Sequence, residues 1–409
     1  MRRRCASVVP PDFDAVVIGA GLVGCSAALA LHRAGRAVLL LESSPAPLAP
    51  AGDARALVLS AASVEILTEL ALWSRIAPHA TSIRHIRVSD RGGCGALELD
   101  AADGGLENLG WACPADILLY ELRTAVAAAL GAGACWSTRY SAHHVYPDRV
   151  EIELQNGDET RRVCTALVIG ADGNRSALRA ACGIETEGYD YGQHALVAKI
   201  AVERPAAHTA FEHFTRQGPL AMIPCGGAFY VSVQCLNETR AMAALTLDAG
   251  AYGAELERRF GARLGRITVQ GARRAHGLLR QRARQVIAPR TVLIGNAANT
   301  MHPNAAQGLN LGLRDVATLA ACLGADADGD AGKAALLERY AAARAPDHRR
   351  TVGFTDLLAQ GFRSRLWPLT VTRRLALTLA DLSPATKQRV IHEASGLAAL
   401  ARSTAAVRP

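Results

Sequence analysis

The sequence predicts an α/β fold in which a mainly β segment is inserted and a helical segment closes the chain. Three observations lead to this prediction. A glycine pattern near the start lies between two apolar, β-rich runs, as in a βαβ unit. Short apolar runs separated by Pro and Gly follow between residues 183 and 270, as in a sheet. After residue 345 the pattern is helical and basic.

The βαβ unit opens the chain. Asp14–Ile18 is a short apolar run, the turn that follows is Gly19–Gly24, and an Ala/Leu-rich helix continues to His32. Residues 36–41 form a second predicted strand, which ends at Glu42. Further helices are predicted at 60–73, 116–130 and 309–322, a hairpin over 83–99, and strands at 149–154, 166–169, 195–202, 210–214, 229–234 and 291–294.

The composition narrows the class of protein. With 50% hydrophobic and 20% charged residues, the 409-residue chain is globular and has core enough to fold without disulfides. The net charge of +8 is concentrated, because residues 344–409 carry eleven Lys or Arg and four Asp or Glu. A nucleic-acid enzyme usually spreads its basic residues over a binding face, so we expect no nucleic-acid partner. None of the ten cysteines forms a CxxC pair, so we expect no metal site. Their even number is compatible with disulfides, but their scatter through apolar runs favours reduced, buried thiols.

The N-terminal region could pass for a signal peptide, because Arg2–Arg4 precede the uncharged run 15–31. Two prolines and two aspartates separate the arginines from that run, and no small-residue cleavage site follows it. The run is also short for a membrane span. We therefore expect a cytoplasmic protein without a transmembrane helix.

The glycine turn predicts a dinucleotide site. Gly19, Gly21 and Gly24 follow the GxGxxG spacing, in which the glycines allow a tight turn, close approach of a pyrophosphate, and close packing of helix on strand. The pyrophosphate then lies at the helix N-terminus. Glu42 ends the next strand, where an acid accepts hydrogen bonds from an adenosine ribose. This motif by itself does not distinguish NAD from FAD.

Two later segments make that distinction through a family resemblance. One is a strand that leads into Asp172-Gly173, and the other is a strand that leads into Gly295-Asn296. Together with the first motif, and in this order over residues 12–350, they resemble the class A FAD-dependent aromatic hydroxylases. The stretch 295–315 resembles the hydroxylases of ubiquinone biosynthesis in particular. Residues 89–92 and 214–224 are similar to the 2-polyprenyl-6-methoxyphenol hydroxylase branch.

The resemblance implies the domain organisation. It implies an aromatic-hydroxylase-like fold, with a Rossmann-like FAD-binding domain in two parts, residues 12–182 and 286–345. A mainly β substrate domain would span 183–285, and residues 85–111 would contribute to its sheet. A basic helical segment would follow at 346–409.

The resemblance also implies roles for individual residues. The FAD pyrophosphate would lie on Gly19, Gly21 and Gly24, beside Asp172 and Gly173, with Glu42 on the ribose. The ribityl chain and flavin would contact the residues of the second half of the site, which are Arg55, Gly295, Asn296, Gly308, Leu309 and Asn310. Asn296 replaces the Asp of most relatives, and the alternative for Arg55 is a surface arginine in a loop. The stretch 302–307, called the flavin-facing loop below, would supply the candidate catalytic residues His302, Pro303 and Gln307.

The flavin-facing loop also departs from the family pattern. Asn304 and Ala306 stand where we expect an aliphatic residue and a glycine. If residue 306 needs a positive φ, Ala306 carries strain of about 1–2 kcal/mol. His302 would either help to deprotonate a phenol or be a structural loop histidine, so the base stays unassigned.

The reaction that the resemblance implies is hydroxylation of a polyprenylated methoxyphenol to the 1,4-benzoquinol in ubiquinone biosynthesis. The oxygen would come from O2 through a flavin C4a-hydroperoxide, with NAD(P)H as electron donor. Two alternatives stay open: another FAD-dependent aromatic hydroxylase, and a non-catalytic flavin-binding scaffold among other quinone-biosynthesis proteins. A flavin reductase or a halogenase on the same fold is the runner-up enzyme class, and the halogenase is disfavoured because no WxWxIP motif occurs.

The C-terminal segment suggests a further contact. Val371, Leu375, Leu379 and Leu382 fall on one helical face, and Arg373-Arg374 lie beside it. A basic amphipathic helix suits the surface of an anionic bilayer, where a polyprenyl substrate resides. The alternative is a helix that packs on its own protein or on a partner subunit. We therefore expect either peripheral contact with the inner face of the membrane or a packed helix.

Overall fold

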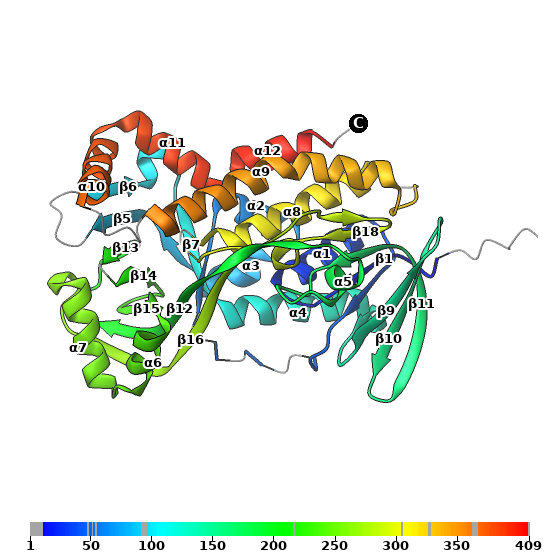
Figure 1. The fold of residues 1–409 in the computed structure, drawn as a ribbon, viewed down its shortest axis with the longest axis horizontal. Helices are drawn as coiled ribbons and strands as arrows, with labels where there is room; N and C mark the ends of the chain where they lie inside the picture. Colours follow the sequence, from blue (N-terminus) through cyan, green and yellow to red (C-terminus); the bar gives the residue numbers. More distant parts are fainter. Residues whose placement is uncertain are drawn as a thin grey trace, which may run out of the picture.

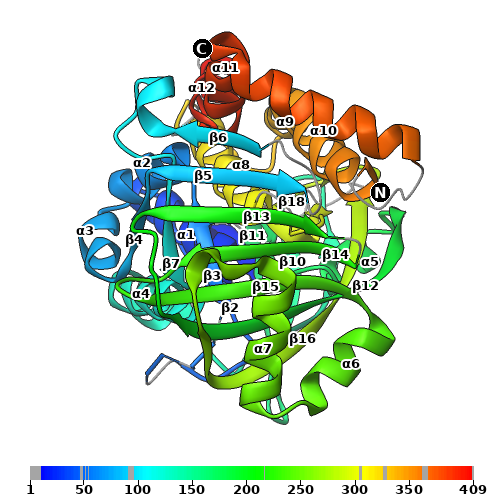
Figure 2. The same cartoon turned by 90° about the vertical axis from the view of Figure 1, so that its left-hand side faces the viewer.

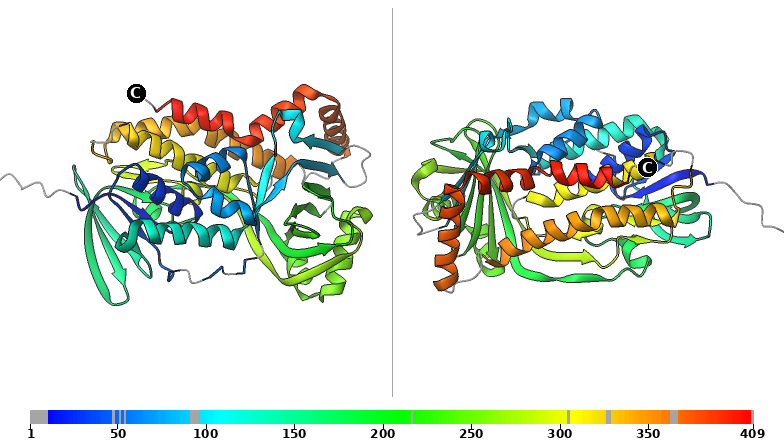
Figure 3. Two further views of the ribbon diagram at one scale, coloured as in Figure 1. Left: turned by 180° about the vertical axis from the view of Figure 1, so that it is seen from behind. Right: turned by 90° about the horizontal axis from the view of Figure 1, so that it is seen from above.

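The computed structural model describes residues 11–46, 49–50, 52–53, 55–90, 96–215, 217–303, 306–325, 329–361 and 367–407 (Figure 1). Side chains within 357–361 and 367–374 lie outside the description. Two large sheets lie side by side along the long axis of the molecule, and helices pack over both (Figures 1 and 3).

The first sheet has the order β17-β18-β11-β1-β2-β8, and β10 and β9 extend it from β11. Its strands are β1 Phe13–Ile18, β2 Val38–Leu41, β8 Ala134–Cys135, β9 Arg139–Val145, β10 Val150–Asn156, β11 Glu159–Gly170, β17 Ile287–Ala288 and β18 Thr291–Leu293. β1 pairs in parallel with β2 and β11, so both of its faces are buried and its sequence is a continuous apolar run. This arrangement brings the ends of β1 and β11 together at one edge.

Helices bury the first sheet. α1 Leu22–Arg33, α4 Ala115–Leu130 and α8 Gln307–Gly324 pack into the largest core cluster, together with α2 Ala61–Glu69. α5 Ala177–Ala181 follows β11. The helix expected over 60–73 ends early, because Ala71 has a left-handed φ of +57°, and α3 Trp73–Ile76 begins separately. A small sheet of β3 Ala56–Leu59, β7 Gly110–Pro114 and β4 Thr81–Ile83 lies between the two large ones.

The second sheet has the order β19-β16-β12-β15-β14-β13-β5-β6. Its strands are β5 His85–Asp90, β6 Ala96–Asp100, β12 Thr186–Val202, β13 Thr209–Thr215, β14 Gly218–Pro224, β15 Phe229–Asn237, β16 Ile267–Ala283 and β19 Asn299–Thr300. α6 Glu238–Thr246 and α7 Ala249–Phe260 cover its outer face, in front of the sheet in Figure 2. The predicted hairpin over 83–99 forms β5 and β6 of this sheet.

Parts of this second sheet are not evident from the sequence pattern. β12 is 17 residues long and begins well before the predicted strand at 195, and the equally long β16 was not predicted. The reason is that β16 contains four arginines and two glutamines in place of an alternating apolar pattern. The helices α6 and α7 were also not predicted within the segment read as mainly β.

Four helices close the chain. α9 Ala334–Gly361 runs along α8, and α12 Leu397–Ala405 lies beside both (Figure 3). α10 Trp367–Leu382 and α11 Pro384–Ser395 pack at the β5–β6 end of the second sheet (Figure 2). Within the described ranges no helix has the length and apolar character needed to cross a bilayer. The eight cysteines in these ranges are free thiols.

Candidate functional site

The glycine turn between β1 and α1 leaves one open position. A Cβ on Gly24 would lie 1.9 Å from the carbonyl oxygen of Gly19, and Gly19 itself has a φ of +102°. These two glycines are therefore required by the packing of the turn. A Cβ on Gly21, in contrast, would meet nothing within 4 Å. α1 begins directly afterwards at Leu22 without a side-chain cap, so its first amides are available to an anionic ligand.

Glu42 is held as an anion beside this turn. Its Oε2 accepts from the amide of Ala20 at 2.8 Å and lies 3.3 Å from Arg123 Nη2, and its Oε1 accepts from the amide of Ser44 at 2.9 Å. Burial alone would raise the pKa of Glu42, but the hydrogen bonds from Ser44 and Ala20 and the charge of Arg123 outweigh it and lower the pKa. The ionised carboxylate can accept ribose hydroxyls.

Arg123 is a site residue that sequence analysis missed. It lies on α4, and besides Glu42 its Nε donates to the carbonyl oxygen of Ala20 at 2.8 Å. One guanidinium thus fixes both the glycine turn and the acid that follows β2. No local motif marks this arginine, since it comes from a helix a hundred residues later in the chain.

Asp172 has two roles at the end of β11. Its Oδ2 accepts from the amides of Ala177 and Leu178, at 2.8 and 3.3 Å, and so caps α5. Its Oδ1 is buried and has no hydrogen-bond partner in the described part of the chain. A buried carboxylate oxygen without a donor indicates that a ligand supplies one. Gly173, with a φ of +83°, turns the chain beside it.

The loop after β18 brings the second glycine motif to the same edge. Gly295 has a φ of +57°, and its amide donates to Asp315 Oδ2 on α8 at 3.1 Å. Asn296 is exposed, which leaves its side chain accessible to a ligand. Asn310 is buried: its Oδ1 accepts from Ser60 and Ser63, and its Nδ2 donates to two carbonyl oxygens. The side chain of Asn310 therefore anchors α8, and only its backbone can face a cofactor.

A buried ion cluster supports this loop from behind. Asp315 Oδ1 accepts from Arg344 Nε at 2.8 Å and lies 2.7 Å from His348 Nε2, and Arg344 also pairs with Asp347 at 2.8 Å. Burial would raise the pKa of Asp315, but the charges of His348 and Arg344 lower it. Since Asp315 also binds the amide of Gly295, the cluster ties α9 to the second glycine motif. No sequence motif marks this cluster, because its members come from two helices.

The start of α8 confirms the strain expected in the flavin-facing loop. Ala306 is the N-cap of the helix and has φ +49° and ψ 34°. Gln307, Gly308 and Leu309 follow as the first turn of α8, whose amides have no intrahelical partner. Asn304 lies outside the described residues.

Replacing Ala306 with Gly should raise the free energy of unfolding by about 1 kcal/mol, because Gly adopts a positive φ without a Cβ clash. Ala320→Gly, in the middle of α8, should lower it by about the same amount. Urea denaturation of both variants measures the two effects. A loss of stability in Ala306→Gly would contradict the strain.

His302 is buried against the second sheet. Its ring packs edge-on against Tyr191 of β12, with ring centroids 4.8 Å apart. The hydroxyls of Tyr191 and Tyr189 both donate to Asp356 Oδ1 of α9, that of Tyr191 at 3.1 Å. Pro303, the next residue, is exposed. His302 therefore packs on β12, which α9 in turn binds through Asp356.

Arg55 lies at the junction of the two sheets. Its Nε pairs with Asp53 at 2.8 Å, and its side chain is 51% exposed. Burial lowers the pKa of His276 on β16, and the positive charge of Arg55 lowers this pKa further. Arg55 is thus close enough to affect a residue of the second sheet, as a residue at a shared site would be.

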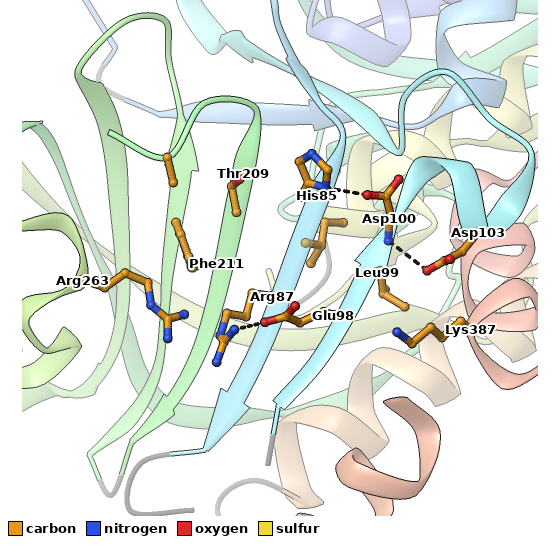
Figure 4. Close-up of a pocket in the computed structure, with 12 residues that line it drawn as sticks. His85, Arg87, Glu98, Leu99, Asp100, Asp103, Thr209, Phe211, Arg263 and Lys387 are labelled. Carbon is orange, nitrogen blue, oxygen red and sulfur yellow. Dashed lines mark hydrogen bonds and ion pairs between the residues drawn. The ribbon is translucent and has the colours of Figure 1, made fainter. Parts of the chain in front are cut away.

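A groove at the far end of the second sheet is a separate feature. It has a volume of about 570 Å³ and lies over β5, β6 and β13, near Lys387 of α11 (Figure 4). His85 pairs with Asp100 at 2.9 Å and Arg87 pairs with Glu98, so its charges largely neutralise one another. No residue of the glycine motifs lines it, so we do not place a cofactor there.

These observations fit FAD. The open position at Gly21 and the free amides of α1 accommodate a pyrophosphate, Glu42 an adenosine ribose, and Asp172 and Asn296 further polar groups of the cofactor. The uncapped start of α8 favours the negative charge that a flavin acquires on reduction.

Comparisons with known proteins agree with this geometry. The "FAD binding domain" family model matches residues 12–355. The chain is 34% identical to "Ubiquinone hydroxylase UbiL" of Rhodospirillum rubrum, over 94% of this chain and 89% of that one. It is 31% identical to "3-demethoxyubiquinol 3-hydroxylase" of Escherichia coli, over 94% and 98%.

Solved structures show the same fold. p-Nitrophenol 4-monooxygenase of Pseudomonas putida superposes with a TM-score of 0.76 at 16% identity, over 93% of this chain and 96% of that one. Anhydrotetracycline hydroxylase of Streptomyces rimosus gives 0.71 at 24% identity, over 94% and 76%. The chain belongs to the FAD-binding-domain family and is an FAD-dependent monooxygenase with the fold of the aromatic hydroxylases.

Proposed function

We propose that the protein hydroxylates a polyprenylated methoxyphenol, 2-polyprenyl-6-methoxyphenol, to the 1,4-benzoquinol in ubiquinone biosynthesis. NAD(P)H donates the electrons and O2 the oxygen atom. The observation that carries the proposal is an apolar row on the second sheet, on the face that meets the flavin-facing loop. Ala221, Val233 and Val197 lie directly opposite one another in it. Such a surface suits a prenylated ring, and the relatives named above act on ubiquinone precursors according to their names.

The bound FAD supplies the transfer of oxygen from O2 to the ring. The chain's own residues bind and orient the two molecules. The glycine turn, Glu42 and Asp172 hold the adenosine diphosphate half, and Gly295, Asn296 and the first amides of α8 hold the ribityl chain and flavin. Arg55 and His302 lie where the two sheets meet, and the buried His302 helps to exclude water from the ring.

Quinone-intermediate profiling of a deletion strain tests the proposed substrate. The strain should accumulate a polyprenylated methoxyphenol and regain quinone when the wild-type gene is restored. Accumulation of an intermediate that lacks a hydroxyl at another ring position would assign the protein to that position. Full rescue by a variant that binds no FAD would instead support the non-catalytic scaffold.

We also propose that α10 places the protein on an anionic bilayer. Leu375, Leu379 and Leu382 are 58, 65 and 73% exposed, whereas Leu377 and Ala380 of the same helix pack against the second sheet. These exposures argue against the interpretation that the apolar face is packed internally. The expected fourth member, Val371, and the arginines 373 and 374 have side chains outside the described residues. The net charge of +7 in residues 344–409 complements an anionic surface.

The variant Leu375→Asp/Leu379→Asp should lose sedimentation with anionic liposomes while it retains bound FAD. Val145→Asp/Met242→Asp is the matched control, because it places the same charges on exposed apolar residues elsewhere. Salt should weaken binding of the wild type through screening. Wild-type protein that ignores anionic liposomes would contradict the membrane contact, and unchanged sedimentation of the α10 variant would show that another surface makes it.

A further inference from the structure

Glu212 lies on the face of the second sheet that looks toward the flavin-facing loop. Its neighbour Phe211 belongs to the core under α6 and α7, and successive residues of a strand point to opposite faces. Glu212 therefore points away from those helices. The opposite face carries Tyr191, which contacts His302. The proposed substrate surface and Glu212 thus share one side of the sheet.

The strand register places Glu212 in the apolar row already described. It lies directly opposite Ala221 of β14 and Val88 of β5, and the row continues through Val233 and Val197. Directly opposite residues of neighbouring strands point to the same face. Glu212 is the only acid among these five residues, so it is the proton acceptor that an aromatic ring on this row would meet.

The surroundings of Glu212 leave its carboxylate without a compensating charge. The residue is half-buried. No hydrogen bond or ion pair joins it to another described residue. Burial raises the pKa of Glu212 to about 7, because no opposite charge compensates it. A group with such a pKa can exchange a proton near neutral pH.

Other titratable groups lie on this face of the sheet as well. Cys235 of β15 interacts electrostatically with Glu212. Burial raises the pKa of the Cys235 thiol, and the charge of the Glu212 carboxylate raises it further. The neighbouring strands, the flavin-facing loop and α9 contribute further charged or titratable groups of the described residues, which include Asp90, Lys199, Arg274, His276, Arg280, Tyr189, Tyr191, His302 and Asp356. Asp381 and Lys387, from the helices over β5 and β6, pair with each other.

We propose that Glu212 is the catalytic base that takes the phenolic proton of the substrate, an inference that rests on the proposed function. The phenolic O–H bond breaks, its proton goes to a carboxylate oxygen of Glu212, and the electron pair stays on the phenol oxygen. The phenolate ring is more electron-rich and accepts the oxygen atom, which comes from O2 with electrons from NAD(P)H. The ring carbon then loses its hydrogen as a proton, which restores the hydroxyl, and Glu212 returns its proton to solvent.

Three variants test the base: Glu212→Gln, which cannot take a proton, Glu212→Asp, which can, and Glu65→Gln, an exposed control on α2. Glu212→Gln should retain bound FAD and lose about 100-fold or more in kcat/KM for phenol hydroxylation. The wild-type rate should fall as the pH drops below about 7, the pKa of the carboxylate, and this acid limb should disappear in Glu212→Gln. Glu212→Asp should retain the limb.

Thermal unfolding gives a readout independent of activity. A raised pKa in the folded protein means that Glu212 costs stability as the pH rises from its ordinary value toward the folded one. The Tm of Glu212→Gln relative to wild type should therefore be higher at about pH 8 than at about pH 5. The Glu65→Gln control should show no such change.

Binding of an alkylated phenol without a nitro group, whose own pKa of about 10 lies well above the range tested, keeps the inference separate from the proposed function. Its affinity for the oxidised wild-type holoenzyme should depend on a protein group with a pKa near 7, and this dependence should be absent in Glu212→Gln. Equal titrations of the two proteins, or an unchanged rate profile in Glu212→Gln, would overturn the base. A wild type that shows the titration but hydroxylates no phenol would overturn the proposed function alone.

Discussion

Gly21→Val should yield a folded protein that binds no FAD. The added side chain meets no protein atom within 4 Å of its Cβ, so the fold tolerates it, but it occupies the space where the pyrophosphate approaches α1. The loss of flavin absorbance on purification, together with a circular dichroism spectrum like that of the wild type, measures the effect. Hydroxylation should be lost entirely, since the oxygen transfer depends on the cofactor.

Two matched glycine variants separate this effect from damage to the fold. Gly353→Val on α9 also meets open space and should keep its FAD. Gly24→Val should fail to fold, because its Cβ would overlap the carbonyl oxygen of Gly19. Gly21→Val protein with full flavin occupancy would show that the pyrophosphate lies elsewhere.

Asp315→Ala should lower the free energy of unfolding by about 3–5 kcal/mol, because it leaves the fully buried Arg344 without one of its two carboxylates. FAD affinity should fall as well, since Asp315 also accepts from the amide of Gly295. Urea denaturation and flavin titration measure the two effects. Glu393→Ala, which breaks the exposed pair with Arg350, should change stability little.

The stability loss in Asp315→Ala should depend on pH in a defined direction. The pKa of Asp315 is lower in the folded protein than its ordinary value near 3.8, so its contribution is present above that value and is lost as the pH falls below it. The stability difference between wild type and Asp315→Ala should therefore be constant near neutral pH and shrink below about pH 4. A difference that stays constant into that acidic range would show that the charge of Asp315 contributes nothing.

The features predicted best from the sequence are those whose residues lie close together in the chain. The GxGxxG turn and the following acid Glu42 are specified by spacing within one βαβ unit, and the positive φ of Ala306 was anticipated from a missing glycine. Groups assembled from distant segments were missed. Arg123 reaches the first turn from α4, and Asp315 meets Arg344 across two helices, so no short pattern contains either contact.

Glu212 was missed for a different reason. In the sequence it is one acid within an alternating strand, and an acid there normally faces solvent. Only the pairing of β13 between β5 and β14 shows that it shares an apolar row on the inner face of the sheet. The strand β16, with its many arginines, was missed for a similar reason: it pairs with β12, but its sequence has no alternating apolar pattern that would predict a strand.

Isotopically labelled O2 tests the central claim most directly. The purified holoenzyme, supplied with NAD(P)H or a chemical reductant and a short-chain prenylated methoxyphenol, should place one labelled oxygen on the ring and release the quinol product. Gly21→Val protein under the same conditions should give none. A flavin-loaded wild type that consumes O2 without labelling the phenol would contradict the account.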